Sequence, residues 1–296
     1  MSPPFALSTV WMHNRFSRLR DFFSAAEAAG FANFELDASI SLQAIADQSL
    51  PEGQILSLEI PCPTHPKQLG ARLASLDRYE REAARQAALN SFQLAEDIRA
   101  QVLIANLGRV DVSPKLEQAY YEARQRGGPE ADNVRDLQRE LTEMRARNAP
   151  LHLNAALYDL EYLANQAAQS GLKVAIVTPT RFLGFPLPEE LHILLEEFGD
   201  PIYYWHDAGQ GQIFDHLGLV SSAAWLAVGA ERLVGLHLYD VSDRQRWLVP
   251  QANGAVDFEK LKQYLTEETI LTGKFSAGYE PDEITTALTW LKNRLS

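Results

Sequence analysis

The sequence is poor in cysteine, and it contains no block of basic residues and no long apolar run. The single cysteine, Cys62, cannot form an internal disulfide, which favours a reducing compartment. No apolar segment approaches the ~20 residues that cross a bilayer, and the N-terminus lacks the basic and apolar regions of a signal peptide. These absences predict a cytoplasmic protein that does not enter a membrane.

The charge balance is acidic. Acidic residues number 39 and basic residues 27, for a net charge of −12. Such a chain repels a polyanion unless a local basic patch overcomes the overall field. No Lys- or Arg-rich stretch supplies such a patch, so we expect no nucleic-acid partner.

Short apolar runs alternate with segments of helical periodicity along most of the 296 residues. This alternation is typical of repeated strand–helix units with a parallel sheet. The predicted strands cover residues 6–11, 34–37, 55–60, 100–105, 173–177, 202–206, 233–238 and 274–278. Eight such units predict an α/β fold, a (β/α)₈ TIM barrel that forms a single domain over residues 1–296.

One charged segment, residues 111–150, interrupts the alternation after the fourth strand. It is helix-prone on both sides of a Gly-Gly-Pro sequence at residues 127–129, and it is longer than an ordinary connection. We expect a helical insertion, either a solvated excursion or a lid or subunit contact. A homo-oligomer is compatible with the second alternative.

Polar residues stand at the ends of the later strands. Asp207 and His237 each end an apolar run, whereas the fifth strand ends at Thr178, without a carboxylate. In a parallel barrel the carboxyl ends of the strands meet at one mouth, where reactive groups are placed. Asp207 and His237 are therefore predicted to lie at this mouth.

Several segments resemble the xylose-isomerase-like barrels, the sugar phosphate isomerase and epimerase superfamily, which also holds endonuclease-IV-type repair enzymes. These are Leu-Asp-Arg-Tyr-Glu-Arg at residues 76–81, Asn-Leu-Gly at 106–108 and Trp-His-Asp-Ala-Gly-Gln at 205–210. Arg-Leu-Val-Gly-Leu-His-Leu-Tyr-Asp at 232–240 resembles the seventh unit. The resemblance covers nearly the whole chain apart from the insertion and implies the same fold.

The resemblance also implies a divalent cation, Mn, Mg, Co or Zn, held by acids and histidines from the last four strands. Asp207 and His237 match two ligands, and Glu280 could supply the acid of strand eight, although Gly278 fits that position in another alignment. Two further acidic residues, Glu35 and Glu59, are available from earlier strand ends. With two ligands matched, the metal dependence stays open. Asp207, His237 and Glu280 are the predicted catalytic residues.

Three positions carry neutral groups where the resemblance implies charged or metal-binding ones. Thr178 replaces a Glu, and Gln210 and Asn106 each replace a His. Such groups bind hydroxyls better than metals, so all three are predicted to bind substrate.

Two residues near the first strand are also predicted to bind substrate. Arg15 could pair with a carboxylate or phosphate, and Trp11 could stack on a sugar. The alternatives are a solvated charge and core packing. His206 should point away from the barrel centre because Asp207 beside it points inward. Lys274 is predicted to begin strand eight at the opposite end, without a role.

The leading hypothesis is a sugar isomerase or epimerase that acts on a small carbohydrate or hydroxy-carbonyl compound at the mouth. The alternative is an inactive barrel that binds a sugar-like ligand or a protein partner, which the neutral residues at 106, 178 and 210 favour. Nuclease chemistry is disfavoured by the acidic charge and by the missing ligands of the seventh loop.

Overall fold

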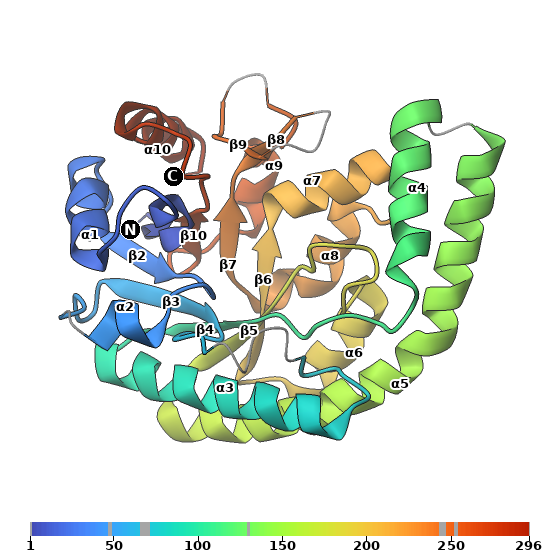
Figure 1. The fold of residues 1–296 in the computed structure, drawn as a ribbon. Coiled ribbons are helices and arrows are strands. Elements are labelled where there is room, and N and C mark those ends of the chain that lie inside the picture. Colours follow the sequence, from blue (N-terminus) through green and yellow to red (C-terminus); the bar gives the residue numbers. More distant parts are fainter. Residues whose placement is uncertain are drawn as a thin grey trace.

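Eight parallel strands form a closed barrel (Figure 1). The computed structural model describes residues 2–46, 49–65, 72–128, 131–242, 247–251 and 254–295. The strands follow one another around the barrel in the order β1-β10-β7-β6-β5-β4-β3-β2. They are β1 (Phe5–Ser8), β2 (Asn33–Leu36), β3 (Ile55–Ile60), β4 (Val102–Ala105), β5 (Lys173–Val177), β6 (Ile202–Asp207), β7 (Leu233–Leu238) and β10 (Ile270–Gly273). The predicted (β/α)₈ fold is confirmed.

Helices surround the barrel, and a short antiparallel pair of strands follows β7. The helices are α1 (Leu19–Ala28), α2 (Leu42–Ala46), α3 (Arg78–Ile98), α4 (Pro114–Gly127), α5 (Asp132–Ser170), α6 (Pro188–Phe198), α7 (Ala208–Leu217), α8 (Ser222–Gly229), α9 (Phe258–Leu261) and α10 (Pro281–Leu295). The short pair is β8 (Asp240–Val241) with β9 (Trp247–Leu248). None of the helices in the described ranges has the length and apolar character that a membrane span requires.

The region predicted as an insertion is a helical hairpin, but its second helix extends beyond the predicted boundary. Helix α5 has 39 residues and runs through Pro150, where the predicted insertion ends. Tertiary contacts on both sides of the proline stabilise the helix against the loss of one hydrogen bond. The Arg145 side chain binds Glu190 and two loop carbonyls, and His152 binds the carbonyl of Ala74. Residues 129 and 130, inside the predicted insertion, lie outside the described residues.

The hairpin of α4 and α5 lies beside α7 (Figure 1) and is bonded to it. The Arg124 guanidinium donates to the carbonyl of His216, and the Gln138 amide donates to the carbonyl of Gly218. The buried Tyr120 hydroxyl donates to the carbonyl of Leu217. The hairpin is therefore packed against the barrel's helical layer, not a solvated excursion.

Strand eight of the barrel, β10, ends before the segment predicted for it. The strand is Ile270–Gly273, whereas the prediction placed it at residues 274–278. The apolar pair Ile270 and Leu271 is buried and pairs with both β7 and β1. Lys274 therefore follows the carboxyl end of the strand, and its predicted place at the opposite end is wrong.

Apolar side chains fill the lower interior of the barrel and form a floor under the mouth. The cluster consists of Ala6, Leu56, Val102, Ile104, Ala175, Trp205, Val234 and Ile270. The Trp205 ring lies so close to Gly235 that a Cβ there would come within 2.2 Å of it. A glycine at this position on β7 thus leaves room for the indole ring inside the barrel.

Candidate functional site

Five charged or titratable side chains meet inside the barrel above this floor. Glu35 comes from β2, Glu59 from β3, Asp207 from β6 and His237 from β7, and Lys274 follows β10. Because side chains alternate along a strand, these positions share the inner face at the carboxyl end. Both Glu35 and His237 are fully buried.

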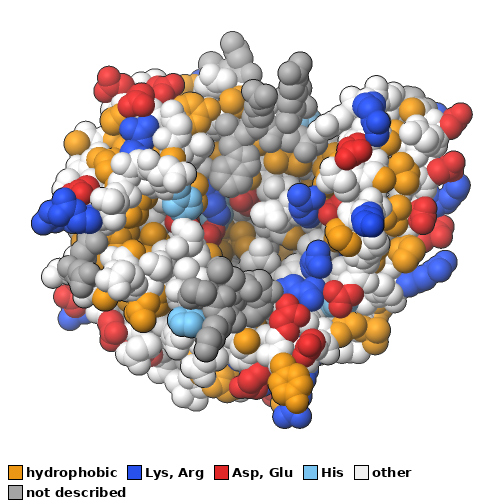
Figure 2. Space-filling model, in the orientation of Figure 1, with side chains coloured by type: hydrophobic (Ala, Val, Ile, Leu, Met, Phe, Trp, Pro, Cys, Tyr) orange, Lys and Arg blue, Asp and Glu red, His pale blue; other side chains and the backbone are white. Residues whose placement is uncertain are grey.

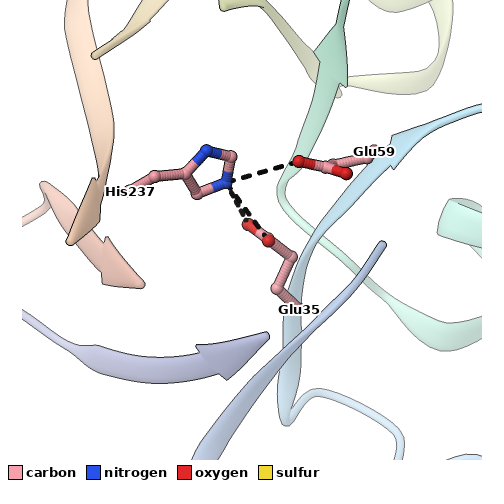
Figure 3. A group of neighbouring side chains, drawn as sticks. All are labelled: Glu35, Glu59 and His237. Atoms are coloured by element: carbon pink, nitrogen blue, oxygen red, sulfur yellow. Dashed lines mark hydrogen bonds and ion pairs between the residues drawn. The ribbon is translucent and has the colours of Figure 1, made fainter. Parts of the chain in front are cut away.

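His237 lies at the centre of the cluster (Figure 3). Its Nε2 is 3.0 Å from Oε2 and 3.2 Å from Oε1 of Glu35, and 3.7 Å from Oε1 of Glu59. Its Nδ1 is 3.6 Å from Oδ2 of Asp207. The imidazole therefore joins carboxylates from three other strands.

The carboxylates set the protonation state of this imidazole. Burial by itself would lower the pKa of His237, but the Glu35 carboxylate raises it, and the net pKa is about 9. Burial raises the pKa of the Glu35 carboxyl, but the charge and hydrogen bond of His237 outweigh this and lower it. Burial acts in the same way on Asp207, whose pKa His237 and Lys274 together lower. At neutral pH the centre is an imidazolium between carboxylates.

Lys274 supplies a second positive charge. Its Nζ donates to Oε1 of Glu59, and the two side chains are only 13% and 17% exposed. Burial lowers the pKa of the Lys274 ammonium, but the carboxylates of Glu59, Glu35 and Asp207 raise it above its ordinary value. The lysine therefore stays charged inside the barrel mouth.

A cavity of about 340 Å³ opens above the cluster. Its walls include Glu59, Asn106, Thr178, Asp207 and Lys274. The space-filling view shows a hollow near the centre of one face, with acidic and basic side chains close together (Figure 2). A small polar molecule fits a cavity of this size and composition.

Of the predicted site residues, Asp207, His237, Asn106 and Thr178 are brought together at the mouth. Asp207 also caps α7, because its Oδ1 accepts a hydrogen bond of 2.8 Å from the backbone N–H of Gln210. The Thr178 hydroxyl accepts from the backbone N–H of Asp207 at 3.1 Å. Asn106 lines the cavity while its Oδ1 accepts from the backbone of Gly108.

The remaining predicted residues lie elsewhere. Gln210 lines a separate cavity beside α4. Glu280 is 70% exposed and pairs with Arg15 at 3.1 Å. The Trp11 indole is fully buried, and its Nε1 donates to the carbonyl of Tyr279. Arg15 also binds that carbonyl, so these three residues hold the loop after β10 instead of meeting His237.

Sequence reasoning named Glu35 and Glu59 only as available acids and gave Lys274 no role. The signal for the two glutamates is a lone charged residue within a run of β-formers, Phe-Glu-Leu and Leu-Glu-Ile. An acid inside a buried strand needs a partner, and the barrel supplies His237 and Lys274. No signal identified Lys274, because its placement depended on where the last strand ends.

His206 faces the helices, as its alternation with Asp207 predicts. Its Nδ1 is hydrogen-bonded at 2.7 Å to the Tyr204 hydroxyl, which is bonded at 2.8 Å to that of Thr178. Burial lowers the pKa of His206 to about 4, against a weaker opposing effect of Asp207. This imidazole is therefore neutral, in contrast to that of His237.

The donor atoms present allow a test of the predicted divalent cation. Glu35, Glu59 and His237 each offer one ligand atom, and these atoms lie within 4.8 Å of one another, a spacing that could hold a cation. However, the Lys274 ammonium already binds Oε1 of Glu59. The His237 Nε2 is also hydrogen-bonded to Glu35, so it carries the proton that a metal would need to displace. The cluster is built for positive charge, but with Lys274 in place it fits a divalent metal ion poorly.

Solved structures match the whole barrel. A structure described as IolI protein with a binding zinc atom matches with a TM-score of 0.68 and 11% identity, over 100% of this chain and 98% of that chain. The 3-keto-D-glucoside 4-epimerase YcjR from E. coli matches with a TM-score of 0.64 and 13% identity, over 98% and 99%. A D-psicose 3-epimerase in the presence of D-fructose matches with a TM-score of 0.66 and 13% identity, over 100% and 99%.

No family model and no curated protein sequence matches the chain. At such low identities the structural matches establish the fold, and activity must be argued from the site. The expectation drawn from the sequence resemblance is confirmed at the level of the fold: the chain forms a (β/α)₈ barrel similar to those of the matched structures.

Proposed function

We propose that the chain is a sugar isomerase or epimerase that acts on a small polyhydroxy carbonyl compound in the cavity at the barrel mouth. The observation that carries this proposal is the pair of carboxylates, Glu59 and Asp207, in the walls of one cavity. Several of the structural matches are described as sugar epimerases, which supports the substrate class.

The two carboxylates come from strands that are not neighbours in the barrel. Glu59 lies on β3 and Asp207 lies at the end of β6. Strands β4 and β5 separate β3 from β6 in the sheet. Proton transfer between adjacent carbons requires an acid and a base on opposite faces of the substrate. Asp207, whose pKa is lowered, is the proposed base, and Glu59 is the proposed group on the other face.

The other groups of the cluster position this pair. His237 lies against Asp207 and Glu35, so it holds the Asp207 carboxylate on one side of the cavity. Thr178 accepts the backbone N–H of Asp207 and is not a base itself. We assign Asn106 to binding substrate hydroxyls, because its amide lines the cavity.

Deuterium exchange tests the proposal. A panel of aldoses and ketoses is incubated with the protein in D₂O, and NMR detects deuterium at the carbon beside the carbonyl. Asp207→Asn and Glu59→Gln should each lower the exchange rate by about 100-fold or more, and His237→Ala should also lower it. Glu280→Gln, which alters an exposed carboxylate outside the cavity, is the matched control. Unchanged exchange in Asp207→Asn and Glu59→Gln would sink the proposal.

The second candidate function is ligand binding without catalysis. It is favoured by the end of β5, where Val177 and Thr178 offer no ionisable group to the cavity. In that case a sugar titration of the unmodified protein would show saturable binding, while the NMR experiment would show no deuterium exchange.

A further inference from the structure

The Glu35–Glu59–His237 cluster has the spacing of a cation site, and the chain's own ammonium is bound to it. The three ligand atoms lie within 4.8 Å of one another. The Lys274 Nζ donates to Oε1 of Glu59, which is also the oxygen 3.7 Å from His237 Nε2. The same oxygen of Glu59 therefore accepts a hydrogen bond from Lys274 and lies near His237, another side chain that could bind a metal.

An ion bound by Glu59 would share this carboxylate with Lys274. Two positive charges on the same carboxylate repel each other strongly where little water screens them, and both side chains are mostly buried. The Lys274 side chain follows directly after Gly273, at the end of β10, and lies in the wall of the cavity with Glu59. The Lys274 ammonium and a metal ion therefore compete for the Glu59 carboxylate.

We infer that the Lys274 ammonium is the resident cation of the Glu35–Glu59–His237 cluster, that it excludes a divalent metal, and that it binds an oxygen of the ligand. The last part rests on the proposed function. An ammonium has three N–H donors, of which Glu59 accepts one. Because Lys274 is part of the cavity wall, a further donor is available to a carbonyl or hydroxyl oxygen.

In the proton transfer proposed above, such an oxygen becomes negative as the neighbouring C–H proton moves to the base. A fixed positive charge beside it stabilises this developing charge. Lys274 acts here as an ammonium throughout and forms no covalent bond, since a nucleophilic lysine must first lose its proton.

Titration with Mn²⁺ of variants in which one lysine is replaced by methionine tests the inference. Lys274→Met removes the ammonium and keeps the apolar stem, and Lys173→Met is the matched control at the other end of the barrel, where β5 begins. Isothermal titration should detect one Mn²⁺ per chain in Lys274→Met, and no saturable binding at millimolar Mn²⁺ in the unmodified protein or in Lys173→Met. At about a hundredfold excess over Kd, Mn²⁺ should raise the Tm of Lys274→Met by about 4 °C.

A second variant covers a failure of Lys274→Met to fold. Lys274→Glu adds a carboxylate at the same place and should require Mn²⁺ for full thermal stability. Stoichiometric Mn²⁺ binding by the unmodified protein would overturn the inference. The inference would also be overturned if neither variant bound Mn²⁺ or gained thermal stability from it, or if neither variant folded even with Mn²⁺.

These titrations need no substrate. If the cation results hold while no sugar exchanges deuterium in the unmodified protein, the proposed function fails and the cation role of Lys274 stands. If exchange occurs but is lost on chelation of metal, the cation role fails and the proposed function stands.

Discussion

Two buried histidines on neighbouring strands have opposite electrostatic environments. His237 on β7 faces the barrel interior, where Glu35 raises its pKa to about 9 despite burial. His206 on β6 faces the helices, where burial lowers its pKa to about 4. Both histidines are fully buried. In the pairing of β6 with β7, His206 lies beside Leu236, and His237 lies beside Asp207.

The difference shows that burial alone does not decide the charge of a side chain in this barrel. The two faces of one sheet offer different partners: carboxylates from other strands on the inside, and the Tyr204 hydroxyl on the outside. An imidazole gains a proton where anions can be brought close to it and loses it where they cannot. A shift of one residue along a strand exchanges these two environments.

Replacing His237 is expected to have the largest effect on this comparison. His237→Gln would leave Glu35 and Asp207 buried without their positive partner, because glutamine carries no charge. Removing one member of a buried ion pair costs about 3–5 kcal/mol of folding free energy. Urea unfolding at pH 7 measures this loss. If His237→Gln lowered the free energy of unfolding by no more than an ordinary surface substitution does, the description of His237 as the centre of the cluster would be contradicted.

Alkaline pH should remove the His237 contribution in the unmodified protein. Its pKa is about 9 in the folded state and about 6.5 in an unfolded chain, so the stabilisation is complete below pH 6.5 and is lost as the pH rises through 9. The expected loss is about 3 kcal/mol. Unfolding measured at pH 6.5, 8 and 9.5 should show this slope in the unmodified protein and a flatter one in His237→Gln. Equal slopes would refute the raised pKa.

Acidic pH should act through His206 with the opposite sign. Its folded pKa of about 4 lies below the unfolded value of about 6.5, so the unfolded state takes up the proton first. Stability is therefore present above pH 6.5 and is lost by about 3 kcal/mol as the pH falls to 4. Other groups also contribute to the pH dependence of stability, so the measurement is the difference in slope between the unmodified protein and His206→Gln. No difference would show that His206 is not buried in its neutral form.

Thr178 connects the two environments, and its replacement should have the smallest of these effects. Its hydroxyl binds Tyr204 on the outer face and accepts the backbone N–H of Asp207 at the mouth. Thr178→Val keeps the shape and leaves these groups unpaired, which should cost about 1–3 kcal/mol. Thr180→Val, two residues further along the loop after β5, is the control. If thermal unfolding shows equal stability for both variants, Thr178 does not couple the two faces.

Much of the fold follows from local patterns, whereas the site follows from them only in part. Asp207 and His237 could be placed at one mouth because each ends an apolar run, and the carboxyl ends of parallel strands coincide. Glu280 could not be placed, because its position depended on the end of β10, and the structure puts it on the surface with Arg15. The insertion boundary predicted at residue 150 does not coincide with a helix end, because tertiary contacts on both sides of Pro150 outweigh its tendency to end a helix.

The amino-acid sequence by itself determined the succession of strands and helices, and with it the closed parallel barrel, because the hydrophobic periodicity is a local property of the chain. It also determined that Asp207 and His206 face opposite sides of β6. Only the tertiary structure decided the partners of these residues. Glu35 and His237 are separated by 202 positions, and Glu59 and Lys274 by 215, and no local pattern encodes their meeting. They meet because closure of the barrel brings the inner faces of distant strands within hydrogen-bonding distance.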